Sequence, residues 1–463
     1  AMLFFATTIN YLDRQVLSLT WKDFIAPEFH WTNNDYGTIT GLFSIFYAVS
    51  MLFAGKFVDW MDTKKGYLWS IGIWSAGAIL HAFCGIATAG IVAGEWTLSF
   101  EGARQAIALV SDVSKVVTVS VSLFVFARLI LAVGEAGNFP AAIKATAEYF
   151  PKKDRAFATS IFNSGATIGA LLAPLTIPFI AKAWGWEMAF IVIGALGFLW
   201  MGVWIFVYEK PEKNKRVSLA ELAYIEQDDS EEGAEMQKDT GAKVTYKQAF
   251  RHRQTWAFAV GKFMTDGVWW FLLFWIPAYL SSVYGLDSTE AAPHIFVVYL
   301  ITMLSIVGGW LPSYFVDKKK MDPYAGRMRA MLIFAFLPLL VLFAQPLGHI
   351  SVWLPVIIIG IAGAAHQSWS ANIFSTVGDM FPKYAVATIT GIGGMAGGVG
   401  SFLINKGSGA LFDYSIETNL RFMGFEGIEA GYFIIFCVCA FAYLIGWVIM
   451  KALVPKYELI KEM

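Results

Sequence analysis

The sequence predicts an all-α membrane protein with twelve transmembrane helices in two pseudo-symmetric six-helix bundles. The composition, the spacing of the uncharged segments and the placement of basic residues lead to this prediction. Of the 463 residues, 57% are hydrophobic and 15% are charged, and the mean hydropathy is +0.57. A soluble chain of this length needs more polar surface to avoid association. The composition therefore excludes a soluble globular protein and indicates one solvated by lipid.

Twelve apolar segments recur along the chain, six before a polar break and six after it. Each approaches or exceeds the roughly 20 residues that a helix needs to cross a hydrocarbon core. No other backbone conformation within one segment satisfies its own hydrogen bonds there. The segments lie at about 1–22, 37–59, 67–92, 118–143, 157–182, 188–208, 255–284, 290–315, 328–347, 351–378, 384–405 and 430–453.

The polar break divides the chain into three predicted parts. Residues 1–208 form the first bundle, residues 209–254 a cytoplasmic loop, and residues 255–463 the second bundle with a short cytoplasmic tail. We interpret the loop as a solvated linker with a short amphipathic helix near 218–228; a regulatory partner site is the alternative. Residues 93–117 are too long for a tight turn, and their alternating pattern predicts an extracytoplasmic helix.

Lysine and arginine concentrate in alternate connections between the segments. Examples are 64–65, 210–216 and 318–320, together with the C-terminal tail, whereas the opposite connections carry scattered single charges. Positive residues gather on the cytoplasmic side of multi-pass proteins. The pattern predicts that both termini face the cytoplasm, as an even number of spans requires.

The connection between spans 2 and 3 has a counterpart in the second half. It has the sequence GKFVDWMDTKK at 55–65, and a weaker echo, SYFVDKKK, lies at 313–320 between spans 8 and 9. This repetition indicates an internal duplication, with two related bundles moving about a central site.

The 55–65 segment resembles the loop signature of the major facilitator superfamily. Gly55, Asp59, Lys64 and Lys65 occupy signature positions, and the resemblance implies that they belong to a gating loop. The segment departs from the signature at Trp60, where a basic residue is usual, and at Asp62, where a glycine is usual.

Ionisable residues inside the spans are the strongest functional signal, because a charge at mid-bilayer costs at least about 2.5–3.5 kcal/mol. Span 1 contains Asp13 and Arg14, and span 4 contains Arg128 and Glu135 on one helix face, about two turns apart. Structural salt bridges are one interpretation, but apolar residues of similar volume would often be as stable. An anion carrier needs a cation for the carboxylate and an acid that takes up protons. A nearby arginine favours the ionised acid and burial disfavours it, so an arginine shared by acid and substrate can couple the two.

The same residues extend the family resemblance. NYLDR at 10–14 and ARLILAVGEAGNFPA at 127–141 resemble the anion:cation symporter branch of the superfamily. The resemblance implies proton coupling by Asp13 and Glu135, and substrate binding or coupling by Arg14 and Arg128. Residues 261–280 and 365–382 look most like bacterial hexuronate transporters, which implies the bacterial cytoplasmic (inner) membrane as the location.

Other polar and aromatic side chains in the spans are candidates for substrate recognition. Lys262 and Asp266 lie one turn apart in span 7, where a structural ion pair is the alternative. The polar residues of span 10 could equally make interhelical hydrogen bonds, but a hydroxyl-rich substrate needs such donors and acceptors. The candidates are Tyr11, Tyr47, Asn163, Lys262, Asp266, Trp270, His366, Gln367, Trp369 and Asn372.

Glycines indicate where helices approach one another closely. Gly165 and Gly169 in span 5, and the glycines at 391–400 in span 11, have small-xxx-small spacing. The span 11 glycines are not a nucleotide-binding loop, since they lack a preceding strand and a phosphate-binding lysine.

The sequence thus predicts proton-coupled import of a sugar-acid anion, a hexuronate such as glucuronate or galacturonate, by alternating access. The alternatives are galactonate or another organic anion as substrate, sodium coupling or anion exchange, and, from a different class, a non-transporting membrane sensor of sugar acids. No nucleophile with its base and no His/Cys metal cluster indicates an enzyme, a cofactor or a metal. The expected partners are the anion, protons and the lipid bilayer, without nucleic acid, and we expect a functional monomer.

Overall fold

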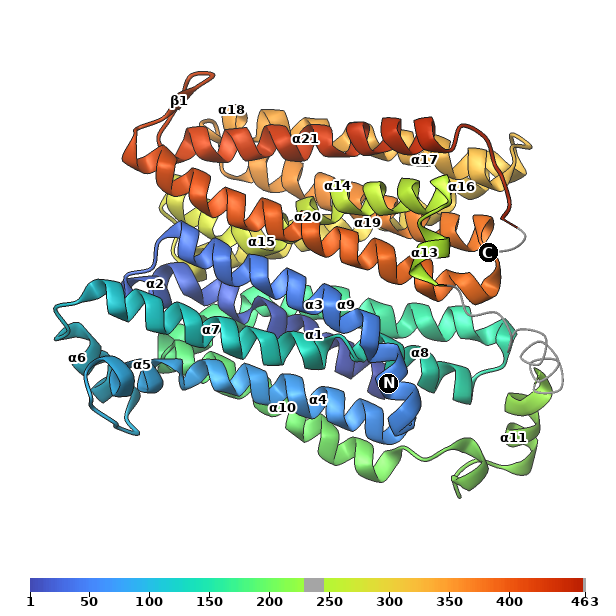
Figure 1. The fold of residues 1–463 in the computed structure, drawn as a ribbon, viewed down its shortest axis with the longest axis horizontal. Coiled ribbons are helices and arrows are strands. Elements are labelled where there is room, and N and C mark those ends of the chain that lie inside the picture. The colour runs from blue at the N-terminus through green and yellow to red at the C-terminus, as the bar shows by residue number, and fades with distance from the viewer. Residues whose placement is uncertain (229–244, 461–463) are drawn as a thin grey trace. The chain divides into compact units, whose positions relative to one another are not determined.

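The computed structural model describes residues 1–228 and 245–460 of the chain (Figure 1). Nearly all of this part is helical, and two short strands, β1 (Arg421–Phe422) and β2 (Phe425–Glu426), form an antiparallel hairpin. The predicted all-α fold is confirmed. The centre of the predicted 209–254 loop and the last three residues lie outside the described residues.

Each predicted span corresponds to one helix or to two consecutive helices. The spans of the first half are α1 (Met2–Thr20), α3 (Asn33–Met61), α4 (Thr63–Ala82) with α5 (Cys84–Val92), α7 (Val113–Glu135) with α8 (Asn138–Tyr149), α9 (Lys152–Trp184) and α10 (Trp186–Val207). Those of the second half are α14 (Arg253–Tyr284), α15 (Ser288–Thr302) with α16 (Val307–Asp317), α17 (Pro323–Phe336) with α18 (Ala344–Gly348), α19 (Trp353–Met380), α20 (Lys383–Glu417) and α21 (Ile428–Leu453). Short helices connect them: α2 (Ala26–Phe29), α6 (Phe100–Ala108), α11 (Leu219–Ile225) and α13 (Tyr246–Ala249).

Most of these helices are long and apolar enough to cross a membrane. Among the described residues, 9 spans pass on length and hydropathy, and α4 with α5, bent by 51°, makes a tenth. The sequence also predicts that α1 and the glycine-rich α20 span the membrane, and neither is among these ten. Asn10, Asp13, Arg14 and Gln15 lower the hydropathy of α1, so two of the four candidate charges contribute to its polarity.

Packing divides the chain into two compact units. The first comprises Ala1–Val16, Val49–Ala173 and Ile180–Ala242, and the second Leu17–Ala48, Pro174–Phe179 and Lys243–Met463. This division follows packing and not internal duplication. The predicted boundaries at 208 and 255 therefore stay a prediction.

Glycines bring α9 against α1 in the first unit. A Cβ atom at Gly165 would lie 2.4 Å from the carbonyl oxygen of Phe4, and one at Gly169 would lie 2.5 Å from that of Thr8. Real Cβ atoms do not approach backbone oxygens so closely, so only glycine fits here. The predicted close approach at Gly165 and Gly169 is confirmed.

The second unit uses glycines in the same way along α20, which packs against α14 (Figure 1). A Cβ atom at Gly400 would lie 2.1 Å from the carbonyl oxygen of Phe263 on α14. At Gly398 it would lie 2.3 Å from Cβ of Ala48 on α3. The span 11 glycines thus allow α20 to approach both helices closely.

The start of α3 is capped by a carboxylate that is distant in sequence. The backbone N–H groups of Asn33 and Asn34 donate to Asp413 of α20 at 3.0 and 2.7 Å, and the Asn33 side chain donates at 2.8 Å. Lys406 Nζ lies 2.7 Å from Asn34 Oδ1 and 2.6 Å from Thr38 Oγ1. An anion at a helix N-terminus satisfies free N–H groups and opposes the helix dipole, so Asp413 fixes where α3 begins.

Two connections contain the helices that the sequence predicts. In the 93–117 segment, Ser99 caps α6 by accepting a hydrogen bond from Gly102 N–H, and Arg104 of α6 donates to Glu187 at 2.7 Å. After α10, Ser218 caps α11 in the same way. Both predicted helices are confirmed, while the extracytoplasmic location of α6 stays a prediction.

Replacing Asp413 by alanine is expected to lower the free energy of unfolding by about 1–2 kcal/mol, the cost of losing a helix cap. Thermal unfolding of the purified protein in detergent measures it as a lower Tm. Asp413→Asn keeps hydrogen-bond acceptors and should lose less, and Glu417→Ala, exposed on the same helix, should change nothing. Equal Tm values for Asp413→Ala and Glu417→Ala would contradict the capping role.

Candidate functional site

Helices α1 and α7 of the first unit contain four buried charged residues. Asp13 and Arg14 of α1 are 1% and 4% exposed, and Arg128 and Glu135 of α7 are 1% and 0% exposed. Surface ion pairs contribute little and can be rearranged freely, whereas charges withdrawn from water must be compensated by their neighbours. The charges of these four residues therefore have to be compensated within the unit.

Arg14 and Glu135 form a direct ion pair between α1 and α7. Arg14 Nε and Nη2 both donate to Glu135 Oε2, at 3.0 and 2.7 Å. The other oxygen, Oε1, accepts no hydrogen bond from the described residues. The Tyr11 ring lies beside Arg14, with 5.1 Å between its centroid and Arg14 Cζ. Tyr11 therefore contacts the predicted cation, and one glutamate oxygen stays available for a proton.

Asp13 lies in the same buried environment. Its carboxylate is next to Trp74 of α4 and within electrostatic reach of Glu135 and Arg128. A Cβ atom at Gly134 would lie 2.2 Å from Trp74 N, so α4 and α7 touch through their backbones at this level. This contact brings Trp74 into the charged cluster, where the sequence alone gave no reason to place it.

In this arrangement a ligand carboxylate can replace the Glu135 carboxylate as the partner of Arg14. With both acids ionised, two carboxylates balance two guanidinium groups. A ligand carboxylate that takes the Arg14 hydrogen bonds removes the cation that favours ionised Glu135, and protonation of Glu135 then becomes easier. The cluster therefore has the parts needed to link anion binding to proton uptake.

A second cluster lies in the second unit, on α14, α19 and α21. Lys262 Nζ is 2.8 Å from Asp266 Oδ2. His366 Nδ1 is 2.8 Å from the Tyr443 hydroxyl, and the Trp269 ring stacks on the His366 ring with centroids 5.3 Å apart. The structure brings these groups together from helices far apart in sequence.

Tyr47 of α3 and Trp270 of α14 also meet in this unit. Their ring centroids are 5.8 Å apart, and the rings are tilted by 58°. Both side chains are only partly buried. The pair therefore offers aromatic surface and a phenol hydroxyl at one place.

The remaining candidates lie in other surroundings. Trp369 is fully buried and packs edge-on against Tyr443, with centroids 5.5 Å apart. The Asn372 amide donates to the carbonyl oxygens of Gly308 and Ser368, both at 2.8 Å, and joins α19 to α16. Gln367 is half-buried on α19 and Asn163 is exposed on α9, so substrate contacts for these four stay predictions.

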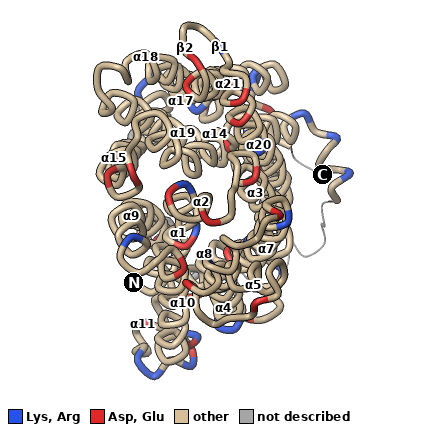
Figure 2. The backbone as a smooth tube through the Cα atoms, turned by 90° about the vertical axis from the view of Figure 1, so that its left-hand side faces the viewer, with Lys and Arg blue, Asp and Glu red and all other residues tan. Residues whose placement is uncertain are grey.

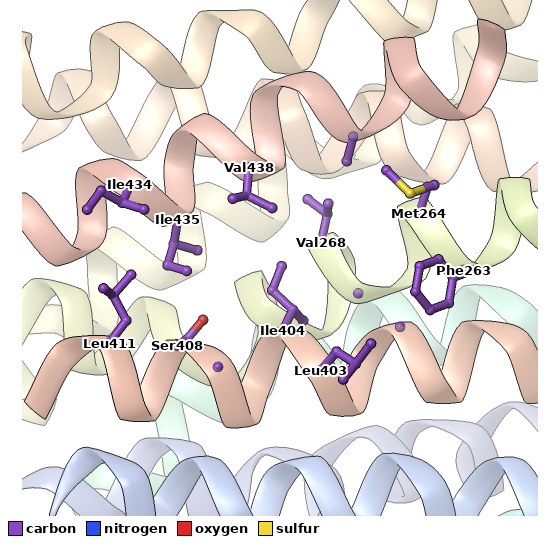
Figure 3. A pocket seen from close by; sticks show the side chains of 14 residues that line it. Phe263, Met264, Val268, Leu403, Ile404, Ser408, Leu411, Ile434, Ile435 and Val438 are labelled. Carbon is purple, nitrogen blue, oxygen red and sulfur yellow. The ribbon is translucent and has the colours of Figure 1, made fainter. Parts of the chain in front are cut away.

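The cavities of the second unit differ in chemistry. A cavity of about 480 Å³ between α14, α20 and α21 is lined by apolar residues and Ser408 (Figure 3). Such a lining has no group that could bind an anion. A cavity of about 280 Å³ between α16, α17 and α19 contains Arg327, but Asp379 already pairs with this arginine at 2.6 Å.

The predicted gating loop is tied to its surroundings by ion pairs. Asp59 Oδ1 lies 3.0 Å from Lys144 Nζ of α8, and Asp62 Oδ1 lies 3.0 Å from Lys210 Nζ after α10. Charged residues also gather around α11 (Figure 2). Lys64 is half-buried and Lys65 exposed, and nothing lies within 4 Å of a Cβ atom placed at Gly55.

The backbone conformation at Asp62 agrees with the glycine that is usual at this position of the family signature. It has φ 68° and ψ 154°, a backbone conformation that costs side-chain-bearing residues about 1–3 kcal/mol and that glycine adopts freely. Partial burial raises the pKa of the Asp62 carboxyl. The Lys210 hydrogen bond, the Thr63 N–H and nearby lysines outweigh it, so the pKa is lowered overall. The hydrogen bond to Asp62 likewise raises the pKa of Lys210.

Several residues of these networks were missed by sequence reasoning. Glu148 accepts hydrogen bonds from Thr63, at 2.5 Å, and from Tyr208. A charged residue just after a span, such as Glu148 or Lys144, could have been recognised as a partner of the loop. Tyr443 gave no signal, because its partner His366 is 77 residues away.

Replacing Asp62 by glycine is expected to stabilise the protein, although it removes an ion pair. Relief of backbone strain gives about 1–3 kcal/mol. The exposed pair is worth about 0–1 kcal/mol, and added glycine entropy costs about 0.5–1 kcal/mol. A net gain of about 1 kcal/mol should appear as a higher Tm in detergent at neutral pH, and a lower Tm would show that the ion pair outweighs the strain.

Asp62→Asn separates the charge from the backbone, since it keeps the strain and loses the charge. A carboxylate with a lowered pKa stabilises the folded state above its unfolded-state pKa, and this contribution disappears as pH falls through its folded-state pKa. Asp62→Asn should therefore lower Tm slightly at neutral pH and match the wild type in acid. A Tm difference that does not depend on pH would rule out the charge as its cause.

Known transporters are similar to this chain over most of its length. The hexuronate transporter of Escherichia coli strain K12 is 29% identical over 418 residues, which cover 89% of this chain and 87% of the transporter. The probable galactarate/D-glucarate transporter of the same strain is 25% identical over 445 residues, covering 93% and 91%.

A solved structure has the same fold. A bacterial homolog of the human lysosomal transporter Spinster, in an inward-facing and occupied conformation, aligns with a TM-score of 0.69 at 18% identity, covering 99% of this chain and 97% of that one. The family model of the Major Facilitator Superfamily matches residues 3–404. With its helical fold and its membrane-spanning segments, this chain belongs to the Major Facilitator Superfamily, a family of multi-pass membrane transporters.

Proposed function

We propose that this chain imports a sugar acid with one carboxylate, a hexuronate such as glucuronate or galacturonate, together with protons and by alternating access. The observation that carries the proposal is the buried Arg14–Glu135 pair with its free glutamate oxygen. The likeness to the hexuronate transporter of E. coli supports the choice of substrate.

Arg14 and Arg128 bind the substrate carboxylate in this proposal. A guanidinium group presents parallel donors that match the two oxygens of a carboxylate. Arg14 already makes two hydrogen bonds to one Glu135 oxygen, so its donors are oriented for an acid. Tyr11 supports the Arg14 side chain through the face of its ring.

Glu135 and Asp13 carry the protons. When the substrate takes Arg14, Glu135 loses its strongest cationic neighbour and binds a proton on its free oxygen. When the proton leaves toward the cytoplasm, ionised Glu135 regains Arg14 and displaces the substrate. Asp13 lies close enough to Glu135 to sense its charge, so its own protonation follows the state of the pair.

Groups of the second unit recognise the uncharged part of the sugar. Trp270 and Tyr47 provide aromatic surface for the apolar face of a sugar ring, and His366 and Tyr443 provide a hydrogen-bonding pair for its hydroxyl groups. The Trp269 ring, stacked on His366, fixes the orientation of the imidazole.

Uptake of labelled glucuronate into proteoliposomes tests the function, with and without an inward proton gradient and with galactonate as competitor. One pH unit supplies about 1.4 kcal/mol per proton, enough for about tenfold accumulation. We expect accumulation that a protonophore abolishes and that galactonate inhibits poorly. Uptake without dependence on the gradient would leave sodium coupling or exchange, and binding without uptake would indicate a sensor.

Glu135→Gln is expected to lose gradient-driven accumulation and to keep exchange of labelled for unlabelled substrate. Glutamine preserves the shape of the side chain but carries no titrating proton. Glu187→Gln is the matched control, because Glu187 is also a buried glutamate, 2% exposed, with an arginine 2.7 Å away. Equal loss of accumulation in both variants would show that Glu135 acts through stability and not through the proton.

A further inference from the structure

Helix α14 presents two different faces. Phe263, Met264 and Val268 line the apolar cavity of Figure 3, toward α20 and α21. Asp266, Trp269 and Trp270 have partly buried side chains at helical spacing (i, i+3, i+4), and this spacing places them on a common face. The face with Asp266 is therefore the one that can meet a polar solute.

A complete ion pair stands on this polar face. Lys262 lies one turn before Asp266, with Nζ 2.8 Å from Oδ2, and the two side chains are 6% and 16% exposed. Lys262 Nζ also lies 4.2 Å from the centroid of the Phe374 ring. The lysine is thus the more buried partner, and its charge is already engaged by a carboxylate and an aromatic face.

Helix α20 leaves room for the carboxylate of Asp266. A Cβ atom at Gly397 of α20 would lie 2.2 Å from Asp266 Oδ2 and 2.9 Å from Asp266 Cγ. Glycine at 397 is therefore the residue that leaves room for the aspartate beside its lysine. The position of Asp266 therefore depends on α20 as well as on its i, i+4 spacing to Lys262 within α14.

The pair leaves this part of the unit without net charge. An unpaired buried lysine attracts a carboxylate strongly, because charge-assisted hydrogen bonds are the strong ones in a dry site. With Asp266 in place, a ligand carboxylate would meet an equal negative charge and would have to displace it. A neutral hydroxyl group meets no such opposition, since it can donate to Asp266.

We propose that Asp266, through its pair with Lys262, makes the transporter select sugar acids with one carboxylate over those with two. This inference rests on the proposed function and adds the residue that sets the substrate class. Sequence likeness leaves this question open, because the two E. coli relatives, a hexuronate transporter and a probable galactarate/D-glucarate transporter, are similar to the chain at 29% and 25% identity.

Competition for glucuronate uptake in proteoliposomes tests the proposal. Galactarate, with two carboxylates, and galactonate, with one, compete against labelled glucuronate. Asp266→Asn frees the lysine charge, so the ratio of galactarate to galactonate inhibition constants should fall about tenfold or more, the scale of one hydrogen bond to a charged group. The double variant Lys262→Gln/Asp266→Asn removes both charges and should return the ratio toward the wild-type value.

Two further variants separate selectivity from folding. Gly397→Ala keeps both charges but pushes the Asp266 carboxylate from its lysine, so the ratio should shift in the same direction even if Asp266→Asn does not fold. Asp379→Asn breaks the Arg327–Asp379 pair of the same unit and should leave the ratio unchanged.

The outcomes distinguish this inference from the proposed function. Wild-type protein that does not take up glucuronate would refute the proposed function itself. Wild-type uptake of glucuronate with an unchanged inhibition ratio in both Asp266→Asn and Gly397→Ala would overturn only the role of Asp266. An equal shift in Asp379→Asn would also overturn it, because the effect would then follow from loss of any ion pair in the unit.

Discussion

A charged side chain in the hydrocarbon interior must keep a partner, and Arg14 and Glu135 provide one for each other across α1 and α7. Removing one partner of such a buried pair costs about 3–5 kcal/mol, although the intact pair stabilises little by itself. The two helices are therefore held at one relative height. Gly165 and Gly169 let α9 reach the backbone of α1, and Gly134 lets α4 reach α7. These glycine contacts thus hold in place the two helices, α1 and α7, whose charges compensate each other.

The ion pair between Asp62 and Lys210 at the predicted gating loop differs from the buried pair in its exposure to water. Asp62 and Lys210 are roughly half-exposed, so water screens their attraction and the pair is easily exchanged. At this loop we expect the backbone strain to outweigh the charge attraction, because Asp62 has a conformation that favours glycine. In the buried cluster the charges have the larger effect, because they limit which residues and helix contacts are possible. An ion pair therefore has different consequences where it is buried and where water reaches it.

The sequence was sufficient for the helical membrane fold and for the four buried charges of α1 and α7, because lipid penalises polar residues wherever they lie in a span. Long-range partners were beyond it. Nothing near Asn33 indicates that Asp413 caps α3, and nothing near His366 indicates Tyr443. Trp369 and Asn372 are predicted substrate contacts because span 10 is unusually polar, and this stays a prediction. In the structure Trp369 packs against Tyr443, and Asn372 bonds to backbone carbonyl groups. Polarity within a span shows that a residue has a partner, but it does not show whether that partner is a ligand or a neighbouring helix.

Charge balance connects the two clusters in the proposed cycle. In the first unit two acids face two arginines, and in the second Lys262 faces Asp266, so neither cluster carries net charge when its acids are ionised. A substrate carboxylate adds one negative charge, and a proton on Glu135 removes one. The empty and the loaded states then have equal charge, which matters because unbalanced charge is costly in a low-dielectric interior. A second carboxylate would break this balance unless another proton accompanied it. In the proposed cycle, the restriction to one carboxylate and the coupling to protons therefore both follow from one requirement for neutrality.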